Sequence, residues 1–468
     1  MAPSKNRSRR EFIKKLAATS AVAGLAPSAM ARDAEVLRRP ARRPVAPNDR
    51  IQIATVGMGI IGFENTHTAL EVPGVELVAA ADCYDARLVR TKEVFGDHVA
   101  TTRDYREILA RSDVDAVIVA TPDHWHAQIA QDAMEAGKDV YCEKPMVHKL
   151  DEGPALIEAQ ERTGRILQVG SQFPSSIVIE KARELYESGA IGELNMIEAR
   201  YNRNSALGAW QYSIPPNVST NEVDWQRFLG NAPARDFDPV RFFRWRNYWD
   251  YGTGVAGDLF VHLITIVHFV TGSNGPTTIA STGGLRFWND GRDVPDVQSS
   301  LFEYPETEAH PPFTLSLQVN LADGSGGGRT LRFIGSDGAM TIDGIRVTVS
   351  RSVRQPASLD ALVNGYNSVR TFSEAVQQAF IEDYRSRQAE TVDLADDLNE
   401  TSAFEAPAGY NDRLDHFLNF FEAMREGGSV LEDAVFGYRA AAPSLLCNQS
   451  YREGRRLAWD PESMTIAS

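Results

Sequence analysis

Three side chains able to bind a hydroxyl group and move its proton stand at separate places in the sequence. Asp258 and His262 lie four residues apart, and the stretch Leu259–Val270 is almost wholly apolar. Residues four apart share one face of a helix, and an apolar helix is buried, so a carboxylate and an imidazole on it need a reason. Lys144 directly follows the short strand-like run Asp139–Cys142, at the strand end where ligands bind in parallel sheets. An acid–base site is one interpretation, and a capping Asp258 with a hydrogen-bonded core His262 is the other.

A glycine-rich turn supplies a second kind of chemistry. It follows the apolar run Ile51–Val56 and precedes a helix-like stretch, which is the context that a dinucleotide-binding fingerprint requires. Asp82 ends the next apolar run, 20 residues beyond the last glycine, where an acid hydrogen-bonds the adenosine ribose. A carboxylate there repels a 2′-phosphate, so NAD is favoured over NADP. The predicted cofactor residues of this turn are Gly57, Gly59, Ile60, Ile61 and Gly62. A packing loop with Asp82 as a strand-end cap is the alternative.

Metal and disulfide chemistry have weaker support. His268 lies six residues from His262, on another helix face, and no third ligand of matching spacing accompanies Asp258 and His262, so no metal site is predicted. The three cysteines are too few for a disulfide scaffold.

The elements around these residues fall into two patterns. Over 49–171, apolar strands alternate with helices, which predicts an α/β Rossmann domain with a covered parallel sheet. Over 172–460, β-rich runs separated by Gly and Asp precede two amphipathic helices, which predicts an α+β domain with a large, mostly antiparallel sheet. Within it, 355–407 has mixed polarity and is predicted to be an insertion.

The first 48 residues look like an export address followed by a tether. Arg9 and Arg10 precede an Ala-rich apolar run, and Ala29-Met30-Ala31 follows as a small-residue cleavage site, so 1–31 is predicted to be a twin-arginine signal peptide. A merely basic N-terminus is the alternative. Residues 32–48 are rich in Arg, Pro and Ala and are predicted to be a flexible linker. The expected location is periplasmic, reached through the twin-arginine export machinery with the cofactor already bound.

Charge restricts the partners. The 468-residue chain has a formal net charge of −15, and 1–31 alone carries +5, which leaves −20 on the remainder. So acidic a body argues against nucleic acid or anionic lipid as a partner.

Two further segments add to this pattern and give it a family resemblance. The tripeptide Glu143-Lys144-Pro145 follows one strand, and Thr121-Pro122-Asp123-His124-Trp125-His126 follows its neighbour. With the fingerprint and the Asp258-x-x-x-His262 segment, the chain from about Arg50 to about Asp460 resembles the Gfo/Idh/MocA family of sugar oxidoreductases. The resemblance implies a Rossmann domain with NAD and a homo-oligomer, a dimer or tetramer formed through the open face of the second sheet.

The resemblance also implies residue roles. Lys144 would hydrogen-bond the substrate hydroxyl, His262 would act as general acid/base, and Asp258 would orient the substrate or the imidazole. Glu143 would support the loop and the cofactor, and Pro145 would form the family's unusual peptide geometry. Further cofactor contacts would come from Lys144 itself and from Thr121, Pro122 and His126; for His126 and its neighbour Trp125 a packing role is equally open.

The sequence departs from the family pattern at two places, and it leaves three candidate functions. Gln172 is followed by Phe173 where an arginine is common, so a substrate-shaping charge is missing, and the aromatic–basic run Arg241–Tyr251 suits either sugar recognition or packing. The main hypothesis is an NAD(P)-dependent oxidoreductase acting on a hydroxyl carbon of a sugar, cyclitol or glycoside. A glycoside hydrolase working by oxidation and elimination is the alternative, and a non-catalytic sugar-binding relative is the third.

Overall fold

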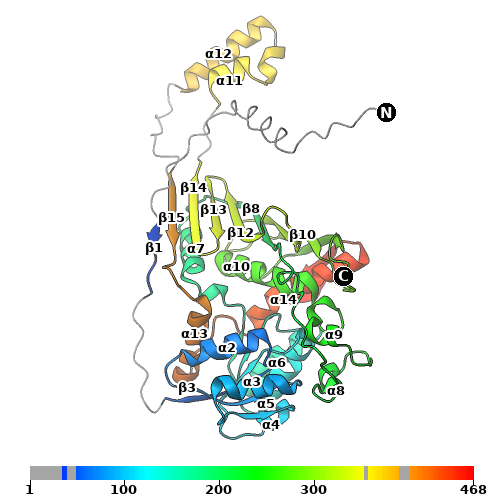
Figure 1. Ribbon diagram of the computed structural model, residues 1–468. Coiled ribbons are helices and arrows are strands. Elements are labelled where there is room, and N and C mark those ends of the chain that lie inside the picture. Colours follow the sequence, from blue (N-terminus) through cyan, green and yellow to red (C-terminus); the bar gives the residue numbers. More distant parts are fainter. Residues whose placement is uncertain (1–33, 40–48, 353–356, 389–399, 468) are drawn as a thin grey trace, which may run out of the picture.

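Two sheets with helices between them make up the chain in the computed structural model, which describes residues 34–39, 49–352, 357–388 and 400–467 (Figure 1). The signal peptide predicted for 1–31 lies outside these residues. In the described chain, no helix is both long and apolar enough to cross a membrane.

The first sheet is the predicted Rossmann sheet. Its six strands among the described residues are all parallel, in the order β4-β3-β2-β5-β6-β7. The strands are β2 (Ile51–Val56), β3 (Val75–Ala81), β4 (Ala100–Thr102), β5 (Ala116–Val119), β6 (Asp139–Cys142) and β7 (Leu167–Val169); the helices are α2 (Ile60–Leu70), α3 (Asp85–Phe95), α4 (Tyr105–Leu109), α5 (His126–Glu135) and α6 (Glu152–Thr163), with a short η1 (Asp123–Trp125). Because β2 and β5 are neighbours, the glycine turn after β2 and the Thr121-Pro122 segment after β5 meet at one sheet edge.

The second sheet has eleven strands in the described chain, in the order β1-β15-β14-β13-β12-β8-β11-β10-β9-β16-β17. Only β1–β15 and β8–β11 pair in parallel, so the sheet is mostly antiparallel as predicted. Its strands are β1 (Glu35–Val36), β8 (Leu194–Asn202), β9 (Thr278–Gly284), β10 (Val297–Tyr304), β11 (Phe313–Asn320), β12 (Gly328–Gly335), β13 (Gly338–Asp343), β14 (Arg346–Arg351), β15 (Thr401–Glu405), β16 (Leu457–Asp460) and β17 (Thr465–Ile466).

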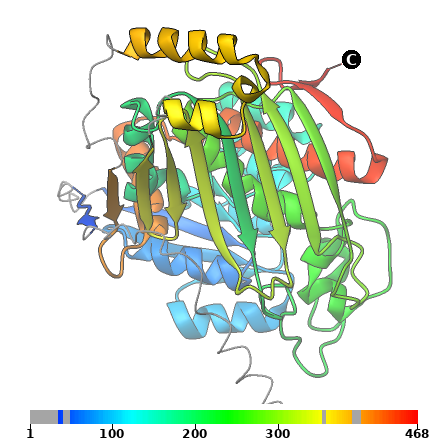
Figure 2. The ribbon, with the colours of Figure 1, turned by 90° about the horizontal axis from the view of Figure 1, so that it is seen from above.

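Long helices cover one face of this sheet and separate it from the Rossmann domain (Figures 1 and 2). They are α7 (Ile177–Glu187), α10 (Val261–Thr271) and α14 (Ala434–Glu453), with shorter turns η2 (Phe173–Ser175) and η4 (Ala256–Phe260) beside them. The segment between β8 and α10 adds α8 (Trp225–Leu229), α9 (Pro239–Phe243) and η3 (Trp245–Asn247). Side chains on the strands alternate between buried and exposed, so the opposite sheet face is the solvent face.

Helix α13 (Asp412–Glu426) belongs to the second half of the sequence but packs on the Rossmann domain. Phe417 lies stacked on Tyr141 of β6, with ring centroids 4.3 Å apart, and Phe420 and Phe421 are fully buried beside them. The side chains of Ser175 and His416 are also hydrogen-bonded, at 2.8 Å. The two sheets are therefore joined by a shared core as well as by the chain crossing at 172.

Two predicted boundaries differ from the structure. Within the linker predicted to be flexible, β1 pairs with β15, and Arg39 forms ion pairs with Glu180 of α7 (2.8 Å) and Asp415 of α13 (3.0 Å). The composition of 32–48 predicts repulsion between its arginines. The carboxylates of Glu180 and Asp415 hold Arg39 in place by their opposite charge. The predicted insertion 355–407 contains α11 (Leu359–Asn364), η5 (Ser368–Thr371) and α12 (Glu374–Gln388), which stand away from the sheet in Figure 1, but its last part is β15, a strand of the sheet.

Candidate active site

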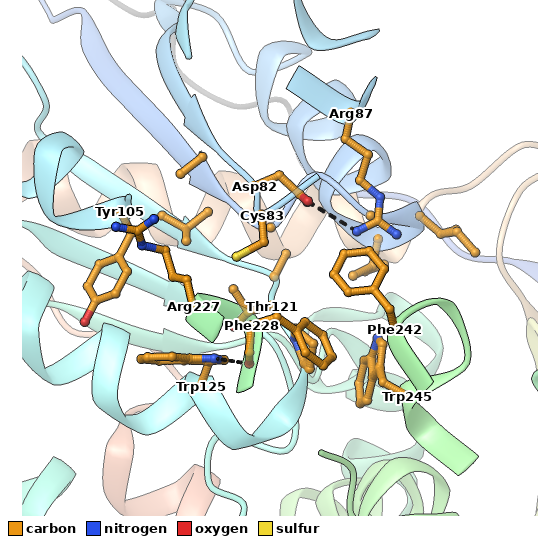
Figure 3. Close-up of a pocket in the computed structure, with 18 of the residues that line it drawn as sticks. Asp82, Cys83, Arg87, Tyr105, Thr121, Trp125, Arg227, Phe228, Phe242 and Trp245 are labelled. Carbon is orange, nitrogen blue, oxygen red and sulfur yellow. Dashed lines mark hydrogen bonds and ion pairs between the residues drawn. The ribbon is translucent and has the colours of Figure 1, made fainter. Parts of the chain in front are cut away.

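A groove lies at the carboxyl ends of β2, β3 and β5 (Figure 3). One wall is the Rossmann domain, including Gly57, Gly59, Ile60, Ile61, Asp82, Thr121 and Pro122. These seven residues were all predicted to bind the cofactor. The groove is therefore where a dinucleotide-binding fold would place its ligand.

The three fingerprint glycines have separate structural reasons. Gly57 has φ +94°, and a Cβ there would come within 2.6 Å of the Ala120 carbonyl oxygen. A Cβ on Gly62 would lie 1.9 Å from the Gly57 carbonyl oxygen, so only glycine lets α2 pack on the turn. A Cβ on Gly59 would meet nothing within 4 Å, because Gly59 faces the groove. This open cradle at the N-terminus of α2 fits a pyrophosphate, whose charge the helix terminus favours.

Asp82 combines the two roles considered for it. Its carboxylate accepts hydrogen bonds from the backbone N–H groups of Met58 (2.7 Å) and Tyr84 (2.9 Å), which makes it a strand-end cap. It also lines the groove and forms an ion pair with Arg87 at 3.3 Å, shown as a dashed line in Figure 3. A carboxylate has about four lone-pair positions, so hydroxyl donors of a ribose can still bind.

The opposite wall of the groove is aromatic and comes from the second domain. Phe228, Phe242, Phe243 and Trp245 line it, and Trp125 of the Rossmann domain donates its indole N–H to the Phe228 carbonyl oxygen (2.9 Å). The same segment is hydrogen-bonded to the Rossmann domain through Asp224 N–H to Cys83 O (2.8 Å) and Asp85 N–H to Glu222 O (2.9 Å). The groove thus has walls from both domains, and these backbone hydrogen bonds join the two walls beside Asp82.

Lys144 and Asp258 come together in a buried ion pair. The Lys144 ammonium donates to Asp258 Oδ1 at 2.9 Å and to the Asp258 carbonyl oxygen at 2.8 Å. Arg246 Nε approaches the same Oδ1 at 3.3 Å, and Arg246 also lines the groove. The side chains of Lys144 and Asp258 are only 11% and 8% exposed. The peptide bond between Lys144 and Pro145 is cis, which is the unusual geometry that the resemblance implied.

Burial and neighbouring charge set the ionisation of this cluster. Burial alone would raise the pKa of the Asp258 carboxyl, but Lys144, Arg246 and Arg203 together outweigh it and hold that pKa well below its usual range. Burial, followed by the positive charge of Lys144, lowers the pKa of His262 well below its usual range. Asp258 is therefore a carboxylate at neutral pH, and His262 is a neutral imidazole able to accept a proton.

His262 is near the pair but is not oriented by Asp258. No hydrogen bond joins them, and Nδ1 of His262 is buried without a partner in the described chain. Its ring lies 5.0 Å from the ring of Phe173 and 6.3 Å from that of Tyr201. The helix is also π-helical over η4 and α-helical only from Val261, so the simple one-face spacing does not apply. Of the two roles predicted for Asp258, orienting the imidazole has no hydrogen bond to support it, and orienting the substrate stays a prediction, with Lys144 as the contact of Asp258.

Glu143 and His126 support the site from behind it. Glu143 is buried, accepts a hydrogen bond from Asn65 Nδ2 (2.8 Å) and so ties the Lys144 loop to α2. The His126 ring nitrogens face the carbonyl oxygens of Pro145 and Thr121, each at 2.8 Å. His126 is absent from the groove lining, and both its ring nitrogens face carbonyl oxygens, which favours the packing role over the cofactor contact, the two roles left open for it. It aligns the ends of β5 and β6.

Sequence reasoning missed the arginines around His262. Arg246 belongs to the run Arg241–Tyr251, which was singled out without a decision between recognition and packing. Arg329 lies over the Phe173 ring at 3.6 Å, and Arg203 over the Tyr201 ring at 5.3 Å. Arg329 therefore brings a positive charge to the position where Phe173 seemed to remove one. The only sequence signal for Arg329 was its place between a glycine-rich turn and the β-rich run 330–334. Among the described residues, no group of three or more His, Cys, Asp or Glu is placed to hold a metal ion.

Comparison with known proteins agrees with this division of the chain. The model of the GFO_IDH_MocA oxidoreductase family, NAD-binding Rossmann fold, matches 51–171, and that of the family's C-terminal alpha/beta domain matches 183–459. An inositol 2-dehydrogenase of Salmonella typhimurium is 27% identical over 198 residues, which are 41% of this chain and 57% of that protein. A glycosyl hydrolase family 109 protein of Shewanella baltica is 31% identical over 214 residues, 41% of this chain and 45% of that protein.

Solved structures show the same fold at low identity. Levoglucosan dehydrogenase in complex with NADH and L-sorbose is 18% identical with a TM-score of 0.62, over 88% of this chain and 100% of that one. The WlbA dehydrogenase from Bordetella pertussis, in complex with NADH and UDP-GlcNAcA, is 16% identical with a TM-score of 0.60, over 88% and 99%. The curated relatives are matched over only about half their length, whereas the two family models together cover most of this chain. The chain belongs to the Gfo/Idh/MocA family of oxidoreductases.

Proposed function

We propose that this protein is an NAD-dependent oxidoreductase that oxidises a hydroxyl carbon of a sugar, cyclitol or glycoside. The observation that carries the proposal is the position of Arg246, which lines the groove and also contacts Asp258 of the Lys144–Asp258 pair. Groove and acid–base cluster are thereby parts of one site. The names of the inositol 2-dehydrogenase and levoglucosan dehydrogenase relatives support a polyhydroxylated substrate.

The protein side chains divide the work of moving the proton. An ammonium has three donors, and Lys144 uses two of them on Asp258, so the third can bind the hydroxyl oxygen of a substrate. His262 is neutral and its ring has no hydrogen-bond partner on Nδ1 in the described chain, so the imidazole has a ring nitrogen to take the hydroxyl proton. A nicotinamide nucleotide held by the groove residues Gly59, Asp82 and Thr121 would supply the hydride acceptor. Asp258 keeps the Lys144 ammonium pointed at the substrate.

The experiment that tests this function is to purify the protein without added cofactor, denature it and identify released nucleotide by mass spectrometry. Stoichiometric NAD is the expected result, because both domains enclose the groove. A preparation that is empty and does not bind added NAD would remove the oxidoreductase proposal and leave a non-catalytic sugar-binding relative. Adding sugars and inositols to the loaded protein and following the absorbance of NADH then tests turnover.

Asp82 is proposed to bind the adenosine ribose of NAD. We expect Asp82→Ala to lower the affinity for NAD at least about tenfold, since the lost hydrogen bonds are to a charged acceptor. Arg87 would then lose its partner, and discrimination against NADP should fall with it. Isothermal titration with NAD and NADP measures both effects. Asp113→Ala is the matched control, because Asp113 pairs with Arg111 on the surface of the same domain. Equal NAD affinity in Asp82→Ala and wild type would contradict the ribose role.

Glycoside cleavage is the second candidate function. Oxidising a ring hydroxyl acidifies the neighbouring C–H, which permits elimination of the leaving group before the hydride returns to the sugar. The glycosyl hydrolase family 109 relatives, 31% identical over 214 residues, favour it. An aryl glycoside distinguishes the two functions: release of the aglycone without net NADH supports cleavage, and accumulation of NADH supports oxidation.

We also propose periplasmic export and self-association. The twin arginines and the small-residue site at Ala29–Ala31 support the first, and cell fractionation with Arg9→Lys plus Arg10→Lys retaining the protein in the cytoplasm would check it. The uncovered face of the second sheet, where Leu301 is 52% exposed, supports a dimer or tetramer. Light scattering should give a mass of at least two chains, and a monomer would contradict the assembly.

A further inference from the structure

Two arginines lie at the end of the second sheet that faces His262. Arg329 of β12 is directly opposite Tyr201 of β8 in the strand register. Leu331 and Ala199, the next pair on the same side, are buried against the helices, so Arg329 and Tyr201 also point to the helix-covered face. Arg203, two residues beyond Tyr201, continues that face.

An aromatic ring lies between each of these arginines and the imidazole of His262. The guanidinium carbon of Arg329 is 3.6 Å from the centre of the Phe173 ring, and that ring is 5.0 Å from the His262 ring. The guanidinium carbon of Arg203 is 5.3 Å from the Tyr201 ring, which is 6.3 Å from His262. Two planar guanidinium groups, those of Arg329 and Arg203, therefore lie near His262.

The charges in this neighbourhood do not balance. Asp258 is already shared by Lys144 and Arg246. Arg329 forms no ion pair in the described chain: Asp412 and Asp343 act on it only at longer range, and its Nη1 is buried without a hydrogen-bond partner. Arg203 gives Nη1 to the Gly208 carbonyl oxygen at 3.0 Å and likewise has no ion pair among the described residues. His262, being neutral, adds no charge. A desolvated N–H needs a hydrogen-bond acceptor, and two guanidinium charges without an ion pair favour an acceptor that is an anion.

Resting on the oxidoreductase function proposed above, we propose that the substrate carries a carboxylate, as a uronic or aldonic acid does, and that Arg329 and Arg203 bind it. The planar fork of a guanidinium matches the two oxygens of a carboxylate. The close contact with the Phe173 ring restricts the Arg329 guanidinium, so its unpartnered Nη1 is already positioned. The carboxylate would sit on the sheet side of the imidazole, with the reacting hydroxyl at Lys144.

Isothermal titration of the NAD-loaded, full-length protein tests this without a variant. D-Glucuronate is compared with D-glucuronamide, and D-galacturonate with its amide, because each pair has nearly the same shape and the amide lacks the negative charge and one acceptor oxygen. We expect the acids to bind at least about tenfold more tightly, the usual scale of a charge-assisted hydrogen bond. Equal binding of acid and amide in both pairs would overturn the proposal. Glucose 6-phosphate is the second arm: tighter binding than either uronate would overturn the carboxylate in favour of a phosphate.

Variants then test the residues. In Arg329→Gln and Arg203→Gln the ratio of acid to amide affinity should fall toward one. The control is Arg332→Gln, on the same strand but on the outer face, where Arg332 pairs with Glu198; its ratio should match wild type. An unchanged ratio in both test variants would overturn the assignment. Failure of the function itself looks different: acids bind selectively, yet no sugar or sugar acid reduces the bound NAD.

Discussion

Replacing Lys144 by alanine should lower turnover at least about 100-fold while leaving the content of bound nucleotide unchanged. The loss follows from the geometry, because Lys144 has one ammonium donor left for the substrate after two hydrogen bonds to Asp258. The cofactor contact also predicted for Lys144 has no support in the groove, whose lining does not include Lys144, so the nucleotide should stay bound. Steady-state rates on an established substrate, together with mass spectrometry of the denatured variant, measure the two effects.

His262→Ala is the companion variant and should show a similar loss. Burial and Lys144 lower the pKa of His262, so the base form is already present at neutral pH in the wild-type protein. The kcat/KM of the wild type should therefore stay level from about pH 8 to below pH 6.5. His268→Ala is the control on the same helix, because its buried ring is hydrogen-bonded to the Tyr304 hydroxyl at 3.0 Å. Normal rates in both Lys144→Ala and His262→Ala would refute the catalytic assignment.

Asp258→Asn should be the most destabilising single change in the site. The amide leaves the Lys144 ammonium and the Arg246 guanidinium buried beside a neutral group. Removing one partner of a buried ion pair costs about 3–5 kcal/mol. Urea unfolding at pH 7 measures the loss. Glu198→Gln is the matched control, since Glu198 and Arg332 form an exposed pair that contributes at most about 1 kcal/mol.

The pH dependence of the Asp258→Asn effect has a definite sign. The pKa of Asp258 is held below its unfolded value, so the stabilisation is complete above the unfolded pKa near 4 and falls as the pH drops below it. The difference between wild type and Asp258→Asn should therefore be constant from about pH 5 to 8 and shrink in more acidic solution. A difference that instead grows below pH 4 would show that Asp258 is not the ionised partner of Lys144.

Much of the Rossmann half could be predicted because its signals are local. The run Ile51–Val56 became β2 with the same ends, and the glycine turn, Asp82 and Thr121 meet because parallel strands end at one edge. Local patterns also located Asp258 and His262 on a buried helix. They could not supply the π-helical turn before Val261, which changes how those two side chains face.

The rest of the site depends on contacts between distant segments. Arg329 reaches Phe173 only through the register of β12 against β8, a pairing of residues 128 positions apart that no periodicity specifies. His126 misled for the opposite reason: it stands beside Thr121 and Trp125 in sequence, yet its ring turns inward between two carbonyl oxygens. Residue type and neighbourhood in the chain indicate chemistry, but side-chain direction is set by tertiary packing.

The two-residue strand β1 has a consequence for solubility. Strand β15 would be the border of the eleven-stranded sheet without it, and an unpaired border strand offers its N–H and C=O groups to any other extended chain. Glu35, Val36 and the backbone N–H of Leu37 occupy that row before another molecule can, and the ion pairs of Arg39 anchor the segment that follows. Recombinant protein that starts at Asp49 would keep every residue of the groove and the acid–base cluster, yet would expose a template for aggregation through β15.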